Sequence, residues 1–368
     1  MNKAMSASAA ADAESALYAS IRALITSARN TVARGVDLVQ VHTNFEIGRH
    51  IVEYEQQGES RAEYGKQVLK RLAERLTAEF GSGFSATNLK LMRQFYVLHA
   101  QRIGQTASGL FQIQKRPIGQ TLSDLLESTE NRPFSLSWSH YVFLLGIKKA
   151  DERSFYEIEA ASQNWTLREL RRQFQSGLYE RLALSRDKDG IRQLAKQGQI
   201  VSQPHDLLKE PLVLEFLGLS EQARFSESDL EAAIISQIEH FLLELGKGFL
   251  FEARQKRFTF DDDHFFVDLV FYNRLLRCYV LIDLKIGKLT HQDLGQMQMY
   301  VNYFDRYVKT DAESATIGIV LCKKKHAALV EITLPKDANI HAKEYQLYLP
   351  SKEELQQKLA EWAGTLPE

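Results

Sequence analysis

The chain has 368 residues, which is enough for two domains of ordinary size. Its 44% hydrophobic and 25% charged content is typical of a globular protein, and a formal net charge of −1 excludes an overall electrostatic preference for one class of partner. No window approaches 18 apolar residues and the first fifteen residues lack an apolar segment, so we expect neither a membrane span nor a signal peptide.

The two cysteines, Cys278 and Cys322, lie in apolar strand-like runs 44 residues apart. Two isolated thiols provide neither a disulfide framework nor the ligand spacing of a zinc site. This usage suits a reducing compartment, so we expect a cytoplasmic protein that does not bind a membrane.

Residues 12–185 are predicted to be helical, because apolar residues recur at helical spacing in segments 17–28, 64–80 and 88–100. Gly81 and Gly83 are expected to end the second of these helices, and Ser85 is a suitable N-cap for the third. Residues 101–133 are expected to be an irregular connection before helices resume near residue 137. The polar stretch 186–206 has few apolar residues and is predicted to be the linker to a second domain.

Positive charge is concentrated in the N-terminal half. Residues 61–120 contain ten Lys or Arg and three Asp or Glu, in a segment that reads as helix, short turn, helix. This order suits a helix-turn-helix-like unit that binds nucleic acid through phosphate contacts. The side chains expected to face a groove are Ser85, Asn88, Lys90, Arg93 and Gln94. The alternative is a helical bundle or a homo-oligomerisation domain with a basic face.

Residues 207–368 have the pattern of an α/β domain with a mixed central sheet. A helix is predicted over residues 228–246, ending at Gly246, and is followed by strands 249–260, 265–272 and 278–285 connected as hairpins. A helix over residues 290–305 and strands at 316–322 and 344–349 complete the domain.

Two carboxylates and a lysine interrupt the apolar strands. Asp283 and Lys285 are two residues apart and therefore share one face of a strand. If the two strands pair as a hairpin, Asp268 of the preceding strand converges with Asp283. Close carboxylates repel unless a cation neutralises them, and Mg²⁺, with Mn²⁺ as a substitute, prefers oxygen ligands. Such an ion activates water and stabilises negative charge in phosphodiester hydrolysis, where Lys285 would assist. The alternatives are a surface ion pair for Asp283 and Lys285, and an edge-strand solubility device for Asp268.

The order Asp268, fourteen intervening residues, then Asp283-Leu284-Lys285 resembles the motif of the PDDEXK nuclease superfamily. Val267 stands where the name-giving pattern has Pro. On the next predicted helix, Gln296 and Tyr300 are four residues apart and share one face. This Q-x-x-x-Y pattern resembles the RecB-like branch, in which such side chains help to hold the substrate and the region of the catalytic lysine.

The runs GFSATNLKLMRQFY, LSWSHYVFLLGI, FLLELGKGF and VLIDLKIGKLTHQDLGQMQMYVNYFD are similar to those of the bacterial YhcG-type family of PDDEXK nucleases. The resemblance covers nearly the whole chain. It implies a helical N-terminal domain, a restriction-endonuclease-like C-terminal domain and a metal-dependent nuclease activity, without identifying the substrate. We expect a DNA endonuclease, with DNA favoured over RNA. The alternative is a non-catalytic nucleic-acid-binding or partner-recruiting protein that keeps the fold.

Members of the superfamily often recruit a further metal ligand from the first helix of the domain. Glu231 and Glu244 are the candidates, although Glu231 is also explained by a capping box with Ser228. Gln255 on the first long strand is a candidate contact to nucleic acid. The basic run Lys323–Lys325 either follows a nucleic-acid backbone or is simply solvated.

Overall fold

The computed structural model describes residues 37–55, 62–110, 134–184, 186, 188–207, 209, 211–219, 225–260, 263–335 and 338–365. The helix expected over residues 17–28 lies outside this part of the chain. Contacts divide the chain into two compact units between Lys149 and Ala150. No helix in the described ranges has the length and apolar character needed to cross a membrane.

The first unit is helical. Its described elements are a helix over residues 37–55, α2 (Ala62–Phe80), the 3-10 turn η1 (Ser82–Phe84), α3 (Ala86–Leu110) and α5 (Trp138–Leu145). Ser85 caps α3 as predicted, because its Oγ accepts the Asn88 N–H at 3.2 Å. Helix α3 continues ten residues into the segment that was expected to be irregular. Rings of Phe45, Phe95 and Phe134 pack together as the centre of this unit.

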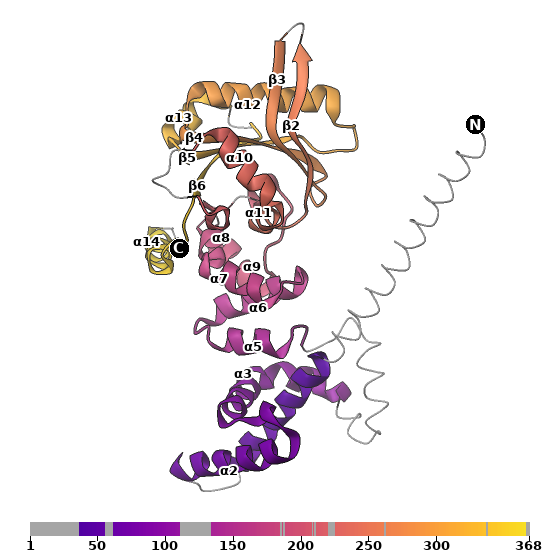
Figure 1. Cartoon of the computed structure of the whole chain (residues 1–368), viewed down its shortest axis with the longest axis vertical. Coiled ribbons are helices and arrows are strands. Elements are labelled where there is room, and N and C mark those ends of the chain that lie inside the picture. Colours follow the sequence, from indigo (N-terminus) through magenta and orange to yellow (C-terminus); the bar gives the residue numbers. More distant parts are fainter. Residues whose placement is uncertain are drawn as a thin grey trace, which may run out of the picture. The chain divides into compact units, whose positions relative to one another are not determined.

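The second unit contains the sheet and most of the helices (Figure 1). Its helices are α6 (Ala150–Ser162), α7 (Leu167–Gln175), α8 (Leu178–Ala183), α9 (Lys188–Gln197), α10 (Glu227–Ser236), α11 (Ile238–Leu245), α12 (His291–Tyr303), α13 (Ala327–Thr333) and α14 (Lys352–Thr365). A π-helical turn, Phe304–Val308, extends α12, and short 3-10 turns occupy Pro204–Leu207 and Glu215–Leu217. The single helix expected over residues 228–246 is two helices, because the chain breaks at Gln237.

The segment 186–206 differs from the expected linker. Helix α9 occupies ten of these residues, and it packs against α6 with Leu194 and Ala195 buried. The apolar spacing Ile191, Leu194, Ala195 is helical but short, and the many polar neighbours concealed it in the sequence. Helices α6–α9 therefore belong to the same compact unit as the sheet.

Among the described residues, six strands form one mixed sheet in the order β1-β6-β5-β4-β3-β2. They are β1 (Leu212–Val213), β2 (Phe249–Phe260), β3 (Asp263–Asn273), β4 (Cys278–Lys288), β5 (Ile317–Lys324) and β6 (Ile340–Gln346). Strands β2, β3 and β4 are antiparallel hairpin neighbours, whereas β4, β5, β6 and β1 are parallel. The helical N-terminal part and the mixed C-terminal sheet confirm the predicted fold class.

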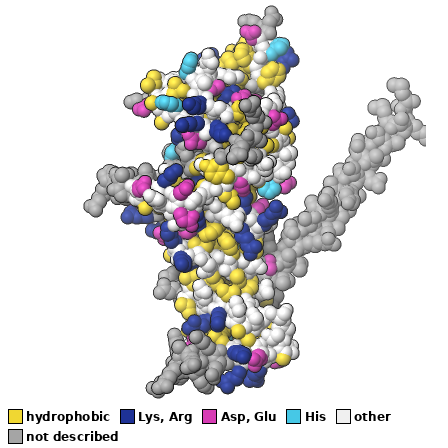
Figure 2. Space-filling model, turned by 60° about the vertical axis from the view of Figure 1, so that its left-hand side comes forward, with side chains coloured by type: hydrophobic (Ala, Val, Ile, Leu, Met, Phe, Trp, Pro, Cys, Tyr) yellow, Lys and Arg dark blue, Asp and Glu magenta, His cyan; other side chains and the backbone are white. Residues whose placement is uncertain are grey.

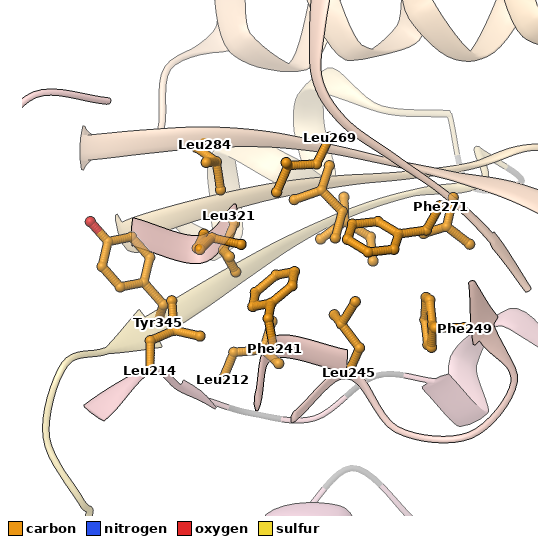
Figure 3. Close-up of a cluster of buried hydrophobic side chains, with 14 of the residues drawn as sticks. Leu212, Leu214, Phe241, Leu245, Phe249, Leu269, Phe271, Leu284, Leu321 and Tyr345 are labelled. Atoms are coloured by element: carbon orange, nitrogen blue, oxygen red, sulfur yellow. The ribbon is translucent and has the colours of Figure 1, made fainter. Parts of the chain in front are cut away.

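Each face of the sheet has its own hydrophobic cluster. Helices α10 and α11 cover one face, where Phe241 and Leu245 pack against Leu269, Leu284 and Leu321 of three strands (Figure 3). Helix α12 covers the other face and buries Leu294, Met297 and Val301 there, as its position across the sheet shows (Figure 1). The central strands β4 and β5 are therefore buried on both sides, which holds residues on them rigidly.

Glu244 of α11 is fully buried in a cluster of cations. Arg181 Nη1 lies 2.5 Å from Oε1, Arg172 Nη1 lies 3.1 Å from Oε2, and the Lys209 ammonium donates to the Glu244 carbonyl. Burial opposes ionisation, but attraction to Arg181, Lys209 and Arg172 lowers the pKa of Glu244 to about 2. The cluster joins α7 and α8 to α11.

Replacing Glu244 by Gln is expected to lower the free energy of unfolding at pH 7 by about 3–5 kcal/mol, because buried Arg181 loses its anionic partner. Urea unfolding measures this change. Glu239→Gln makes the same chemical change on the exposed side of α11 and is expected to cost less than about 1 kcal/mol. Equal losses in the two variants would contradict a structural role for the cluster.

Candidate active site

Asp268 and Asp283 lie where β3 and β4 cease to pair. The ladder between these strands ends with Leu269 opposite Ile282, and the same register makes the two aspartates the next pair. Asp268 Oδ2 accepts the N–H of Leu284 at 2.8 Å, so a side chain supplies the acceptor that a strand would otherwise provide. The predicted convergence of these two carboxylates is therefore present in the structure.

Asp283 and Lys285 project from the face of β4 that α12 covers. Their partners on β5 are Val320 and Cys322, which belong to the hydrophobic cluster under α12. Leu284, between them, belongs to the cluster on the opposite face (Figure 3). Strand alternation thus places the aspartate and the lysine side by side, as the sequence predicted.

Asp283 is 2% exposed and shares its surroundings with a second carboxylate. Burial, followed by repulsion from Asp268, raises the pKa of Asp283 to about 7, although Lys285 acts in the opposite direction. The pair therefore retains a proton near neutral pH unless a further cation is present.

Lys285 places a positive charge directly beside Asp283. Its Nζ lies 2.9 Å from Asp283 Oδ2 and 3.7 Å from Glu227 Oε2. Burial favours the neutral amine, but attraction to Asp283 and its hydrogen bond outweigh it and raise the pKa of Lys285. The ammonium is therefore held charged beside the aspartates.

Glu231 and Gln255 extend the site beyond the two strands. Gln255 Nε2 donates to Glu231 Oε2 at 2.6 Å and to Asp268 Oδ1 at 3.0 Å. Glu231 Oε1 also lies 3.1 Å from Arg254 Nε. Gln255 adopts a φ of 45°, which is unusual for a non-glycine residue in a strand. A glutamine in a strained backbone conformation therefore connects the carboxylate of α10 with that of β3.

The capping box expected between Ser228 and Glu231 is wrong. Ser226 is the N-cap of α10, and its box partner is Asp229. Glu231 is therefore inside the helix, 4% exposed, and its carboxylate is available to the site. The sequence offers two overlapping Ser-x-x-acid patterns here, and only packing of the helix on the sheet distinguishes them.

Gln296 and Tyr300 on α12 form the far wall of the site. The Gln296 amide donates to the Tyr300 hydroxyl, in agreement with their predicted common face. Burial raises the pKa of Tyr300, and the charges of Asp283 and Asp268 raise it further. Tyr300 is 1% exposed and its ring makes an edge contact with Phe258.

The structure does not bring Glu244 to this site, because both of its carboxylate oxygens are engaged by Arg172 and Arg181. Conversely, Glu227 approaches Lys285 although the sequence did not single it out. Its place in the first turn of α10, next to the capping serine, is the signal that could have identified it.

The residues predicted to contact nucleic acid through α3 differ in their exposure. Asn88 is engaged internally, since its Nδ2 donates to the Gly83 carbonyl and its Oδ1 accepts the indole N–H of Trp138. Gln94 makes a long hydrogen bond of 3.4 Å to the Leu145 carbonyl. Arg93 is exposed and its Nε lies 2.6 Å from Glu55 Oε2. Lys90 is exposed.

The donor set suits a hard divalent cation more than zinc. Within the described ranges, no group of three or more His, Cys, Asp or Glu side chains forms a metal site by itself. Asp268 and Asp283 are nevertheless two adjacent oxygen donors that repel each other, which is the condition that Mg²⁺ relieves while it keeps several waters. The residues present therefore fit a hard divalent cation.

Comparison with known proteins agrees with this geometry. Residues 205–360 match the YhcG PDDEXK nuclease domain, and residues 20–181 match the DUF1016 N-terminal domain. The chain is 41% identical over 355 residues to "Putative nuclease YhcG" of Escherichia coli (strain K12), covering 94% of this chain and 93% of that protein.

Two solved structures show weaker similarity. They are a repair endonuclease from Pyrococcus abyssi (17% identity, TM-score 0.23) and an EndoMS–dsDNA complex (15% identity, TM-score 0.25). Each match covers 36% of this chain and 50% of the other chain. The sequence matches over both halves, together with the Asp268, Asp283 and Lys285 arrangement, show that the chain belongs to the YhcG family of PDDEXK nucleases.

Proposed function

We propose that the protein is a cytoplasmic, Mg²⁺-dependent DNA endonuclease. The observation that carries the proposal is the juxtaposition of Asp268 and Asp283 beside the Lys285 ammonium on a strand buried on both faces. A binding protein gains nothing from a raised carboxylate pKa in a rigid strand, whereas a metal-dependent hydrolase requires paired anions that accept a cation. Family membership supports the nuclease activity independently.

Asp268 and Asp283 would hold the metal, with Glu231 close to them through Gln255. A bound Mg²⁺ supplies Lewis acidity toward the phosphoryl oxygen and lowers the pKa of water. Lys285 keeps its proton and stabilises negative charge that develops on the phosphate. The buried Tyr300 hydroxyl accepts a hydrogen bond from the Gln296 amide, so it would hold the partly exposed Gln296 side chain in position beside the site.

The N-terminal unit supports DNA as the substrate. Its basic segment supplies exposed Lys90 and Arg93 on α3, which suit contacts to phosphates rather than base recognition. Asn88, which would read bases, has partners within the protein for both of its amide atoms, and Gln94 is exposed with a long hydrogen bond to the Leu145 carbonyl. We therefore propose that this unit adds affinity without strong sequence preference, and that it acts as a nucleic-acid-binding helical domain.

Removal of the Asp283 carboxylate or of the Lys285 ammonium is expected to reduce the rate of cleavage strongly. Asp283→Ala and Lys285→Ala should each lower the rate by at least about 100-fold, because each removes a group acting on the reacting phosphate. The assay uses linear, nicked, branched and single-stranded DNA, and RNA, with Mg²⁺ or with EDTA. Lys196→Ala, an exposed lysine of α9, is the control and should retain full activity. Cleavage that persists in EDTA, or in both site variants, contradicts the proposal.

The metal-free protein is expected to lose stability as the pH rises from about 4 to about 7. Asp283 has a folded pKa of about 7, above its ordinary value, so the folded state binds the extra proton in this range. Asp283→Asn removes this pH dependence. At pH 8 its free energy of unfolding should exceed that of the wild type by roughly a few kcal/mol, whereas at pH 4 it should not exceed it. Urea unfolding in EDTA at several pH values measures the difference. Parallel pH profiles of the two proteins would refute the proposed repulsion.

Loss of the bridging glutamine is expected to weaken metal binding. Gln255→Ala separates Glu231 from Asp268 and should reduce Mg²⁺ affinity or activity by about 10–100-fold. Isothermal titration with Mg²⁺ measures the affinity. Gln298→Ala on α12, whose amide donates to Asn302 Oδ1 at 3.1 Å, is the matched control. An unchanged affinity in Gln255→Ala would assign that residue a purely structural role.

A further inference from the structure

A second feature of the sheet lies beyond the catalytic residues, where β4 and β5 end. A cavity of about 550 Å³ is present there, lined by Lys288, Leu289, Lys324, His326, Leu329 and Ile332 among others. Neither the metal site nor the proposed chemistry uses these residues. The cavity combines basic side chains with an apolar part, which suits a ligand with an anionic group and a less polar body.

An irregularity in β4 orients Lys288 toward this cavity. Lys285 pairs with Cys322 and Lys288 pairs with Lys324, so two residues of β4, Ile286 and Gly287, lie opposite one residue of β5. Such a bulge reverses the alternation of the strand. Lys288 and Lys324 therefore project from the same face as Asp283 and Lys285, whereas an uninterrupted strand would place Lys288 on the opposite face.

The two lysines form an unneutralised pair. They are direct neighbours on adjacent strands, and like charges in that arrangement repel. In the part of the chain that the structure describes, neither ammonium forms an ion pair with a carboxylate, and both are exposed. Figure 2 shows Lys, Arg and His side chains next to hydrophobic ones toward the upper left, on the surface of the sheet-containing unit. An anion between the lysines would remove the repulsion.

We propose that this cavity binds one nucleotide of the substrate strand near the cleaved bond, with its phosphate between Lys288 and Lys324. The sugar or base then lies against Leu289 and Leu329. The inference rests on the proposed nuclease function and extends it to the path of the strand: the backbone runs along β4 from Asp283 and Lys285 to the lysine pair.

The spacing along the sheet agrees with this path. Cys322 and Lys324, the partners of Lys285 and Lys288, are two residues apart, which corresponds to roughly 7 Å along a strand. Successive phosphates of one DNA strand are farther apart through space than their rise of about 3.4 Å along the duplex axis, so this interval spans at most about two phosphate steps. The cavity is therefore close enough to hold the same strand that is cleaved.

Lysine footprinting tests the contact without altering the fold. The full-length protein in EDTA is treated with an acetylating reagent, alone or with a 30-base-pair DNA duplex, its single strand or the corresponding RNA, and each lysine is quantified by mass spectrometry. Nucleic acid should slow acetylation of Lys288 and Lys324 by at least about five-fold and leave Lys196 and Lys358 unaffected. Poly-L-glutamate of equal total charge, added in place of the nucleic acid, is the polyanion control. Equal protection by this polymer, or no protection by nucleic acid, would overturn the inference.

A charge-matched pair of variants tests the affinity. Lys288→Ala combined with Lys324→Ala should weaken oligonucleotide binding at least about ten-fold and reduce the slope of log affinity against log salt by about 1.5–2. Lys196→Ala combined with Lys358→Ala removes the same charge from exposed positions on α9 and α14 and should behave as the wild type. Fluorescence anisotropy in EDTA, at salt concentrations from about 50 to about 200 mM, measures both the affinity and its salt dependence.

The outcomes separate this inference from the proposed function. Protection and a specific affinity loss without any Mg²⁺-dependent cleavage would support the binding site and contradict the nuclease proposal. Cleavage by the wild type with equal binding by the two double variants would support the nuclease proposal and overturn the nucleotide site.

Discussion

Repulsion between two carboxylates held side by side is the constraint on which the site depends. Asp268 and Asp283 occupy the first positions after β3 and β4 stop pairing, and neither can move away. Asp268 is fixed by the Leu284 N–H and by Gln255, while Asp283 is fixed on a strand that hydrophobic clusters cover on both faces. Because the protein prevents separation, the repulsion can be relieved only by a proton or by a cation.

The surrounding elements maintain this arrangement. Low exposure strengthens the interaction between the charges, and Lys285 compensates one of them without neutralising the pair. Helix α12 supplies Gln296 and Tyr300 above the same face, and α10 supplies Glu227 and Glu231 at its edge. A carboxylate pair that is rigid, partly compensated and open to a hard cation is an arrangement suited to catalysis more than to stability.

Much of the sheet could be predicted from the sequence, because local patterns determine it. The three hairpin strands, the helix after β4 and the common face of Asp283 and Lys285 follow from alternation and turn residues. Glu244 was a candidate metal ligand in the sequence, but in the structure it pairs with Arg172 and Arg181. Its neighbours in sequence do not reveal these arginines, which approach it from helices more than sixty residues away. The bridge made by Gln255 depends on a positive φ that no local pattern indicates.

The N-terminal residues illustrate a second limit. Asn88 has the side chain of a base-reading residue, but in the structure it connects the turn before α3 with Trp138 of α5. Sequence spacing indicates which residues share a helix face, but not whether that face is covered by another helix. The exposed lysine and arginine of α3 remain the side chains suited to phosphate contact.

The buried cluster around Glu244 has a consequence for how the chain is divided. The N-terminal family match ends at residue 181 and the nuclease match begins at residue 205. The cluster crosses this boundary, because it connects Arg172 and Arg181 before it with Glu244 after it. A protein that began at residue 205 would keep the entire sheet with Asp268, Asp283 and Lys285, but it would contain the Glu244 anion in its interior without those arginines. Residues 150–181 therefore belong to the same compact unit as the nuclease domain although they lie across the family boundary, and the two are exchangeable between relatives only together with these charges.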